Sequence, residues 1–210
     1  MDPALRTAAT GMTAQQTRTD VIANNLANVN TTGFKRSRAE FQDLLYQTVQ
    51  GAAVIGTRDA NTLPAVQVGR GVQLAGVQKV YSQGAFETTN RPLDVAVEGE
   101  GFFQVQQPNG QVSYTRDGAF EVSDTGTIVT HQGLAIVPGI KLPPNSSQLT
   151  ISRSGVVTVV RAGDTNPTEI GRIELARFVN PAGLEALGDN LLKQTPASGE
   201  PVTGFPTDDA

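Results

Sequence analysis

Apolar residues recur at two different periods along this 210-residue chain, and the change of period divides it. In the first thirty residues they recur every seven positions, in two interleaved rows: Leu5, Met12, Thr19 and Leu26, and Ala8, Gln15, Ile22 and Val29. The rows occupy the a and d positions of successive heptads, which predicts a helix with a narrow apolar seam. Such a helix buries too little surface to be stable alone, so we expect it to pack against another helix or against copies of itself. The alternative is an ordinary helix that lies on its own domain.

From about Val66 onward the period changes to two. Short runs rich in β-branched and aromatic residues alternate with turn signals at Asn109-Gly110, Asp117-Gly118 and Asp124-Thr125-Gly126. No long helical pattern interrupts them, which favours an antiparallel β-domain, sandwich-like or barrel-like. The predicted fold class is therefore mainly β, with an N-terminal α-helical segment of coiled-coil type.

These patterns divide the chain into four predicted segments: an N-terminal helix over 1–33, an extension or linker over 34–71, a β-rich body over 72–193 and an extended return segment over 194–210. Gly33 is suited to a left-handed position at the end of the helix. Residues 39–46 fit one turn of helix or a short strand equally well. Residues 51–64 are small, polar and weakly patterned, which indicates an extension or loop.

The end of the predicted helix contains four asparagines within seven residues: Asn24, Asn25, Asn28 and Asn30. Asparagine disfavours helix because its side chain competes for backbone hydrogen bonds. A cluster of them needs compensating partners. We hypothesise that these amides bond neighbouring chain segments and so hold the angle at which the helix turns into the body.

The charge pattern gives no sign of a nucleic-acid or anionic-membrane surface. The chain has 16 basic and 20 acidic residues, a net charge of −4, and its basic residues are spread along the sequence. The one basic cluster, Lys35-Arg36-Ser37-Arg38, is typical of a solvated patch. The chain has no cysteine for disulfides or thiolate metal sites, no transmembrane run, and no cleavable secretory signal in its first residues.

Enzyme chemistry finds little support in the motifs. His131 is the only histidine, so no histidine pair can bind a metal. Asp124-Thr125-Gly126 matches the short signature of aspartic proteases, whose two carboxylates share a proton, and a second copy of the chain could supply the other carboxylate. An ordinary hairpin turn is the favoured interpretation. We therefore expect no catalytic residue, metal or cofactor, and keep an Asp124-dependent secreted hydrolase and a ligand-binding β-module as alternatives.

Several segments of the chain resemble those of a known protein family. The run GMTAQQTRTDVIANNLANVNTTGFKR resembles the N-terminal signature of the rod and hook family, the axial proteins of the bacterial flagellum. The segments YSQGAFETTNRPLDVAVEGEGFFQV, YTRDGAFEVSDTGTIVTHQG, ISRSGVVTV and RFVNPAGLEALGDNLL resemble the β-domain of that family in order and spacing. The resemblance covers roughly residues 5–205. Residues 41–64 are similar to the extension of distal rod members, whereas hook members resemble the chain without it.

The resemblance implies a structural subunit that polymerises helically into the distal rod, the rigid hollow shaft that transmits motor torque to the hook. The implied partners are copies of itself, hook and proximal rod proteins, the bushing rings and the flagellar type III export apparatus. The implied location is the rod in the periplasm, reached without a cleaved signal peptide. A hook or proximal rod subunit is the alternative, and we expect no nucleic-acid partner and no membrane insertion.

The resemblance also suggests site residues. The candidate subunit-interface residues are Leu5, Met12, Ile22, Asn24, Asn25, Leu26, Asn28, Val29 and Asn30. Phe41 and Leu45 resemble a short export-gate motif, and an i,i+4 packing pair is the alternative. We expect residues 51–64 to contact adjacent subunits and stiffen the shaft. In the family the N-terminal helix pairs with a C-terminal helix, and no second heptad pattern precedes Ala210. Either the chain is truncated or its core is completed differently.

Overall fold

A computed structural model describes residues 3–51, 53–55, 61–63, 65–163 and 166–206. The contacts divide the chain into two compact units. Unit 1 comprises Met1–Val29 and Arg36–Val80, and unit 2 comprises Asn30–Lys35 and Tyr81–Ala210. The predicted fold class is confirmed, because one N-terminal helix is followed by antiparallel strands.

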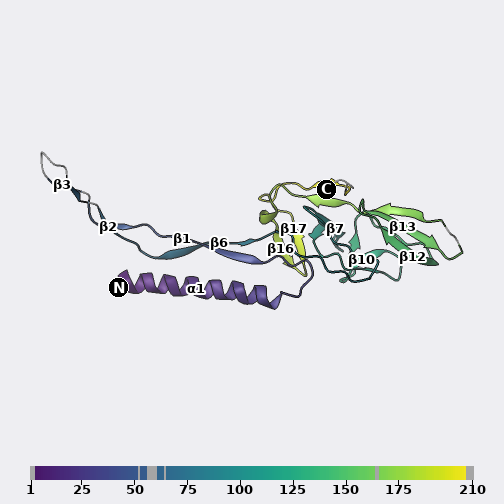
Figure 1. Cartoon of the computed structure of the whole chain (residues 1–210), viewed down its shortest axis with the longest axis horizontal. Coiled ribbons are helices and arrows are strands. Elements are labelled where there is room, and N and C mark those ends of the chain that lie inside the picture. Colours follow the sequence, from purple (N-terminus) through teal and green to yellow (C-terminus); the bar gives the residue numbers. More distant parts are fainter. Residues whose placement is uncertain (1–2, 52, 56–60, 64, 164–165, 207–210) are drawn as a thin grey trace. The chain divides into compact units, whose positions relative to one another are not determined.

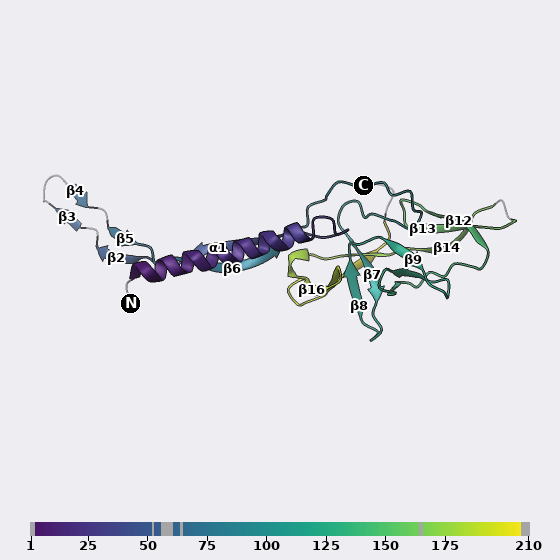
Figure 2. The same cartoon turned by 90° about the horizontal axis from the view of Figure 1, so that it is seen from below.

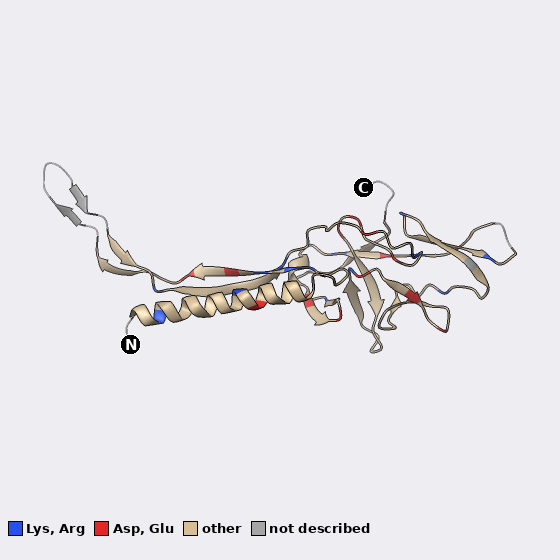
Figure 3. Ribbon diagram, turned by 60° about the horizontal axis from the view of Figure 1, so that its bottom comes forward, with Lys and Arg blue, Asp and Glu red and all other residues tan. Residues whose placement is uncertain are grey.

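Unit 1 places one long helix beside a two-stranded ribbon. Helix α1 (Pro3–Ala27) lies along β1 (Ser37–Asp43) and β6 (Val72–Lys79), which pair antiparallel (Figure 1, Figure 2). Figure 3 shows that few positions of the α1 ribbon are charged, and the sequence of the helix gives them as Arg6, Arg18 and Asp20. In the described part of the chain, no helix has the length and apolar character needed to cross a bilayer.

The ribbon of unit 1 continues through two further pairs of strands. β2 (Gln47–Gln50) pairs with β5 (Val66–Val68), and β3 (Ala53–Ile55) pairs with β4 (Asn61–Leu63). The segment 39–46, whose type the sequence left open, is therefore mostly strand. The predicted extension or loop over 51–64 contains paired strands where it is described, whereas residues 52, 56–60 and 64 lie outside the described residues.

Helix α1 ends at Ala27, before the predicted boundary at residue 33. The asparagines give the reason. The backbone carbonyl of Asn24 accepts both the backbone N–H of Asn28 (3.2 Å) and its side-chain amide (2.9 Å), and the N–H of Val29 then bonds Leu26, three residues back, at 3.2 Å. The asparagine side chain thus competes with continued helix. Gly33 has the predicted left-handed conformation, with φ +71°.

Unit 2 is built of short antiparallel strands and one 3₁₀ turn. Its strands are β7 (Phe102–Gln106), β8 (Val112–Thr115), β9 (Phe120–Val122), β10 (Ile128–Thr130), β11 (Ala135–Ile136), β12 (Ser146–Ile151), β13 (Val156–Arg161), β14 (Thr168–Arg172), β15 (Leu175–Arg177), β16 (Glu185–Gly188), β17 (Leu191–Lys193) and β18 (Val202–Gly204). The 3₁₀ turn η1 covers Pro181–Gly183. The return segment predicted to be extended contributes β18, which pairs with β15.

These strands form two sheets. The larger sheet has the order β16-β17-β8-β7-β11-β10-β9, with β15 bonded to β7 and to β18. The smaller sheet has the order β12-β13-β14. Figure 1 shows β12 and β13 next to β10 within this unit. The predicted antiparallel body is therefore confirmed.

Strand β7 lies at the centre of unit 2, and both of its faces are buried. Successive side chains of a strand point to opposite faces, so Phe102 and Phe103 enter different cores. Phe103 packs with residues of both sheets, among them Phe120, Ile136 and Val157. Phe102 packs on the other side with a second cluster: Tyr114, Ala176, Phe178, Leu184 and Leu192.

Candidate subunit interface

The predicted heptad seam of α1 is exposed in this chain. Its large apolar side chains all have more than half of their surface accessible, with values from 56% to 70%: Leu5, Met12, Ile22, Leu26 and Val29. Val29 lies in the turn just after the helix. A row of apolar side chains on an exposed helix face is a surface suited to another helix.

The opposite face of α1 packs on the ribbon. Its partly buried residues are mostly small: Thr7, Thr10, Gly11, Ala14, Thr17, Val21 and Asn25. Asn28, just after the helix, is partly buried as well. These residues also recur at heptad spacing, so α1 carries two stripes: the exposed apolar seam and a partly buried stripe of mostly small residues. The sequence pattern could have revealed the second stripe through its small residues, but apolar periodicity alone missed it.

Thr10 and Gly71 lie in close contact where α1 meets the start of β6. The Thr10 hydroxyl donates to the carbonyl of Thr7 (2.8 Å) and accepts the backbone N–H of Val72 (3.3 Å). Gly71 has φ +115°, and a Cβ there would overlap with the Oγ1 of Thr10. This position therefore requires glycine for conformation and for space.

The four asparagines have different environments. Asn25 forms two hydrogen bonds with the backbone of Ser37, the first residue of β1: its Nδ2 donates to the carbonyl and its Oδ1 accepts the N–H, both at 2.8 Å. The amide of Asn28 bonds the helix itself, at Asn24. Asn24 and Asn30 are exposed, and within the described residues their side chains form no hydrogen bond. The bond to a neighbouring segment that we hypothesised for all four is thus seen at Asn25.

Phe41 and Leu45 do not form a helical packing pair. Phe41 lies in β1, partly buried and opposite Leu74 of β6, whereas Leu45 follows the strand and is 88% exposed. The i,i+4 interpretation is wrong because that geometry exists only in a helix. Their role as an export motif stays a prediction.

Asp124 lies in the turn between β9 and β10, as the hairpin interpretation predicted. The N–H of Gly126, at φ +79°, donates to the carbonyl of Ser123 (2.9 Å), and the Asp124 carboxylate accepts the hydroxyl of Ser123 (2.8 Å). His131 is exposed, with its Nδ1 3.2 Å from a carboxylate oxygen of Glu121. Among the described residues, no group of three or more His, Asp or Glu side chains is arranged to hold a metal ion.

Comparison with known proteins identifies the class of protein to which the chain belongs. Residues 5–35 match the family model described as "Flagella basal body rod protein". Residues 96–159 match the model of the "Flagellar hook protein FlgE/F/G D1 domain". The helix and the central strands of unit 2 are therefore those of the flagellar rod and hook proteins.

Individual relatives narrow the class to one family. The chain is 48% identical over 206 residues to a flagellar basal-body rod protein FlgG of Buchnera aphidicola, covering 98% of this chain and 79% of that protein. It is 49% identical over 204 residues to the FlgG of Caulobacter vibrioides, covering 97% and 78%. A flagellar hook protein FlgE of Treponema pallidum matches at 47% identity over 119 residues, which cover 57% of this chain and 25% of that protein. The chain belongs to the FlgG family of flagellar basal-body rod proteins.

Proposed function

We propose that this chain is a structural subunit of the flagellar distal rod, which assembles helically with copies of itself and catalyses no reaction. The observation that carries the proposal is the exposed seam of α1. Its opposite face is already occupied by the ribbon, so the apolar row from Leu5 to Val29 is available for contacts between subunits. Burying one leucine in such a contact contributes about 1.5–3 kcal/mol.

The ribbon supports the same proposal. Tyr46, Val49, Val66 and Val68 on β2, β5 and the segment before β2 are all about half exposed or more. An isolated pair of strands is only marginally stable in water, and its unpaired edges favour contact with further chain. Neighbouring subunits that cover this ribbon would stabilise it and stiffen the polymer through many parallel contacts.

The finer features of the proposal come from membership of the family. We infer that hook and proximal rod proteins adjoin the polymer at its ends, that the bushing rings surround it, and that it stands in the periplasm after export by the flagellar type III apparatus. A hook subunit is less well supported, because the hook relative matches only part of this chain whereas the rod relatives match nearly all of it.

Assembly of seam variants tests the proposal. Ile22→Asp and Leu26→Asp should each raise the critical concentration for polymerisation by about tenfold or more, because a buried apolar contact becomes a desolvated charge. Leu26→Met keeps the apolar volume and should assemble like the wild type. Sedimentation and electron microscopy measure assembly. Circular dichroism should show an intact helix in every variant, because both side chains are more than half exposed in the single chain. Unchanged assembly of the aspartate variants would contradict the proposal.

A further inference from the structure

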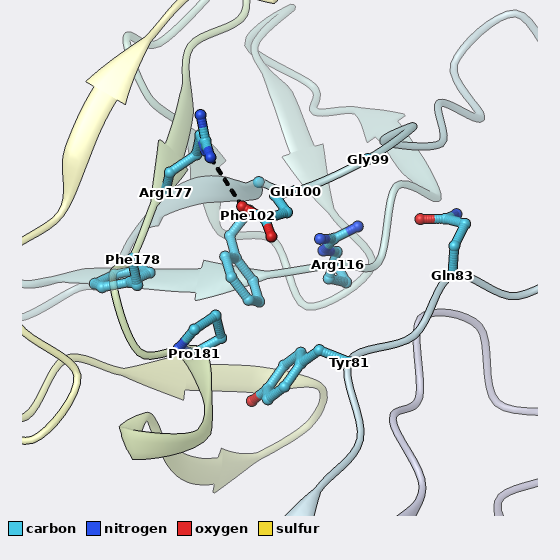
Figure 4. A pocket seen from close by; sticks show the side chains of 10 residues that line it. Tyr81, Gln83, Gly99, Glu100, Phe102, Arg116, Arg177, Phe178 and Pro181 are labelled. Atoms are coloured by element: carbon cyan, nitrogen blue, oxygen red, sulfur yellow. Dashed lines mark hydrogen bonds and ion pairs between the residues drawn. The ribbon is translucent and has the colours of Figure 1, made fainter. Parts of the chain in front are cut away.

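Arg116 of unit 2 is a half-buried cation without a hydrogen-bonding partner among the described residues. In the described part of the chain its guanidinium forms neither a hydrogen bond nor an ion pair, and its Nε is buried. The guanidinium carbon lies 5.1 Å from the centroid of the Phe102 ring, which it covers (Figure 4). By contrast, Arg172 donates to the carbonyls of Ser154 and Pro206 at 2.7 and 3.0 Å. Burying an arginine without acceptors costs free energy, so the arrangement around Arg116 calls for a reason.

A second unpartnered donor lies at the same place. The hydroxyl of Tyr81 is buried and has no hydrogen-bond partner among the described residues. The Tyr81 ring packs edge-on against Phe102, with ring centroids 5.8 Å apart. Arg116 can only donate, and the buried phenol has a proton to donate. What both groups lack is an acceptor.

Arg116 and Tyr81 line a cavity of about 230 Å³, which we call the Arg116 pocket. Figure 4 shows the other side chains around it: Gln83, Glu100, Phe102, Arg177, Phe178 and Pro181. The phenylalanine rings and the proline give it apolar walls. A ligand that fits this lining has an apolar stem and a polar end that accepts hydrogen bonds.

The charges around the pocket favour an anion. Glu100 is already paired with Arg177, at 2.8 Å, and both of these side chains are exposed. Arg116 has no ion-pair partner in the described part of the chain. Burial lowers the pKa of Lys35, and the charge of Arg116 lowers it further. Burial likewise lowers the pKa of Arg116 itself, although Glu100 and Tyr81 oppose that shift. A carboxylate beside the guanidinium would relieve this excess of positive charge.

We propose that the Arg116 pocket binds the carboxylate of a glutamate or aspartate side chain from a second copy of this chain. This inference rests on the proposed polymerisation, which brings copies of the chain together. The chain has 20 acidic residues and a net charge of −4, so a positively charged pocket is complementary to the rest of its own surface. Contacts at α1 would also hold the carboxylate at a high effective concentration, which a free small anion lacks.

Charge variants of the full-length protein test this contact. Arg116→Gln should raise the critical concentration for assembly by about tenfold to a hundredfold, because a charge-assisted bond to a buried group is lost. The single chain should be as thermally stable as the wild type or more stable, since a buried unpaired charge is removed. A merely structural role for Arg116 would instead lower the thermal stability. Arg153→Gln, in the exposed turn between β12 and β13, makes the same charge change and should assemble normally.

Mixed isotope labelling identifies the occupant. Chains with ¹⁵N-labelled arginine are co-assembled with chains whose glutamate and aspartate carry ¹³C, and solid-state NMR then detects nitrogen–carboxyl contacts between copies. We expect one such contact to disappear in Arg116→Gln. Identical contacts in both proteins, or an unchanged critical concentration, would overturn the proposal.

Titrating acetate into the unassembled chain tests whether the Arg116 pocket instead binds a free carboxylate. If acetate saturates the Arg116 signals and the assembled protein shows no carboxyl contact there, the pocket takes a free carboxylate and the second copy is not its occupant. If the wild type itself does not assemble under any condition, the proposed function fails, and this inference fails with it. If seam variants abolish assembly whereas Arg116→Gln does not, only this inference fails.

Discussion

The side-chain amide of Asn25 forms two hydrogen bonds with the backbone of Ser37, in the way that the backbone of a neighbouring β-strand would. Its Nδ2 donates to the Ser37 carbonyl and its Oδ1 accepts the Ser37 N–H, both at 2.8 Å. Asn25 is in the last two turns of α1 and Ser37 begins β1, so the amide joins the end of the helix to the start of the ribbon within unit 1. An asparagine is well suited to this position because its side chain reproduces the donor and acceptor of a peptide group.

Asn25→Ala is expected to loosen this junction. Two hydrogen bonds with net contributions of about 0.5–1.5 kcal/mol each are lost, so hydrogen exchange at the Ser37 amide should accelerate by about tenfold. Asn25→Asp keeps the acceptor but loses the donor and should give an intermediate rate. Asn24→Ala is the control: its side chain is exposed, and alanine is the better helix former, so exchange should stay the same or slow slightly. Equal rates in Asn24→Ala and Asn25→Ala would contradict the role of Asn25.

The helix shows how far periodicity predicts an element. Heptad spacing predicted a helix and its apolar seam, because a period near 3.6 leaves the same residues on one face whatever surrounds them. It offered packing on the helix's own domain only as an alternative, and it did not predict which face packs on the ribbon, since Thr10, Ala14 and Thr17 are too small and too polar to register as apolar. Nor did it single out Asn25 among the four asparagines, because only the position of Ser37 distinguishes them.

In the β-rich body, too, local elements could be predicted from the sequence and long-range contacts could not. Alternating runs and turn dipeptides predicted antiparallel strands, and Asp124 lies in a turn as expected. The pattern carries no information on long-range partners, so the pairing of β15 with both β7 and β18 could not be predicted. Arg116 and Tyr81 were missed for the same reason: 35 positions separate them in the sequence, and only the fold brings them to one cavity.

Gly71→Ala is expected to separate α1 from the ribbon. The new Cβ would overlap with the Oγ1 of Thr10, and φ +115° is unfavourable for alanine, which together should destabilise the contact by about 2–4 kcal/mol. Gly76→Ala, within β6, has no atom within 4 Å of the added Cβ and should cost less than about 1 kcal/mol. Protection of the α1 amides against hydrogen exchange reports both changes. If the two variants lose protection equally, the close approach at Thr10 is not what limits this position.

Tyr81→Phe should improve stability at alkaline pH. Burial raises the pKa of Tyr81, although Arg116 opposes the shift. The folded chain therefore retains a proton that the unfolded chain releases above pH about 10, so this residue's contribution to stability is lost as the pH rises through its folded pKa. The phenylalanine variant has no proton to lose and so lacks this destabilisation at alkaline pH. At neutral pH it removes a buried hydroxyl that has no partner among the described residues, so its free energy of unfolding should equal that of the wild type or exceed it by up to about 1 kcal/mol.

Urea unfolding of Tyr81→Phe and of the wild type, at pH values from neutral to about 11, measures the difference, which should widen above pH 10. Tyr46→Phe in unit 1 is the control, because Tyr46 is 56% exposed. A constant difference across this range would mean that Tyr81 ionises as readily in the folded chain as in the unfolded one.

Shortening the segment 51–64, which we expect to contact adjacent subunits, should make the polymer less stiff. Gln50 of β2 pairs with Val66 of β5, so replacing residues 51–65 with Asn-Gly would close the ribbon with a two-residue type I′ turn. The β1–β6 pairing, the exposed seam of α1 and unit 2 are left unchanged. Assembly should therefore persist, whereas the polymer should bend more easily, because stiffness depends on the number of parallel contacts between subunits. The persistence length of polymers imaged by electron microscopy measures the stiffness.

As the control, a ribbon of unchanged length with Val54 and Thr62 exchanged keeps a cross-strand pair of β3 and β4. It should give polymers as stiff as the wild type. A shortened ribbon that leaves the persistence length unchanged would show that the stiffness arises elsewhere, in α1 or in unit 2.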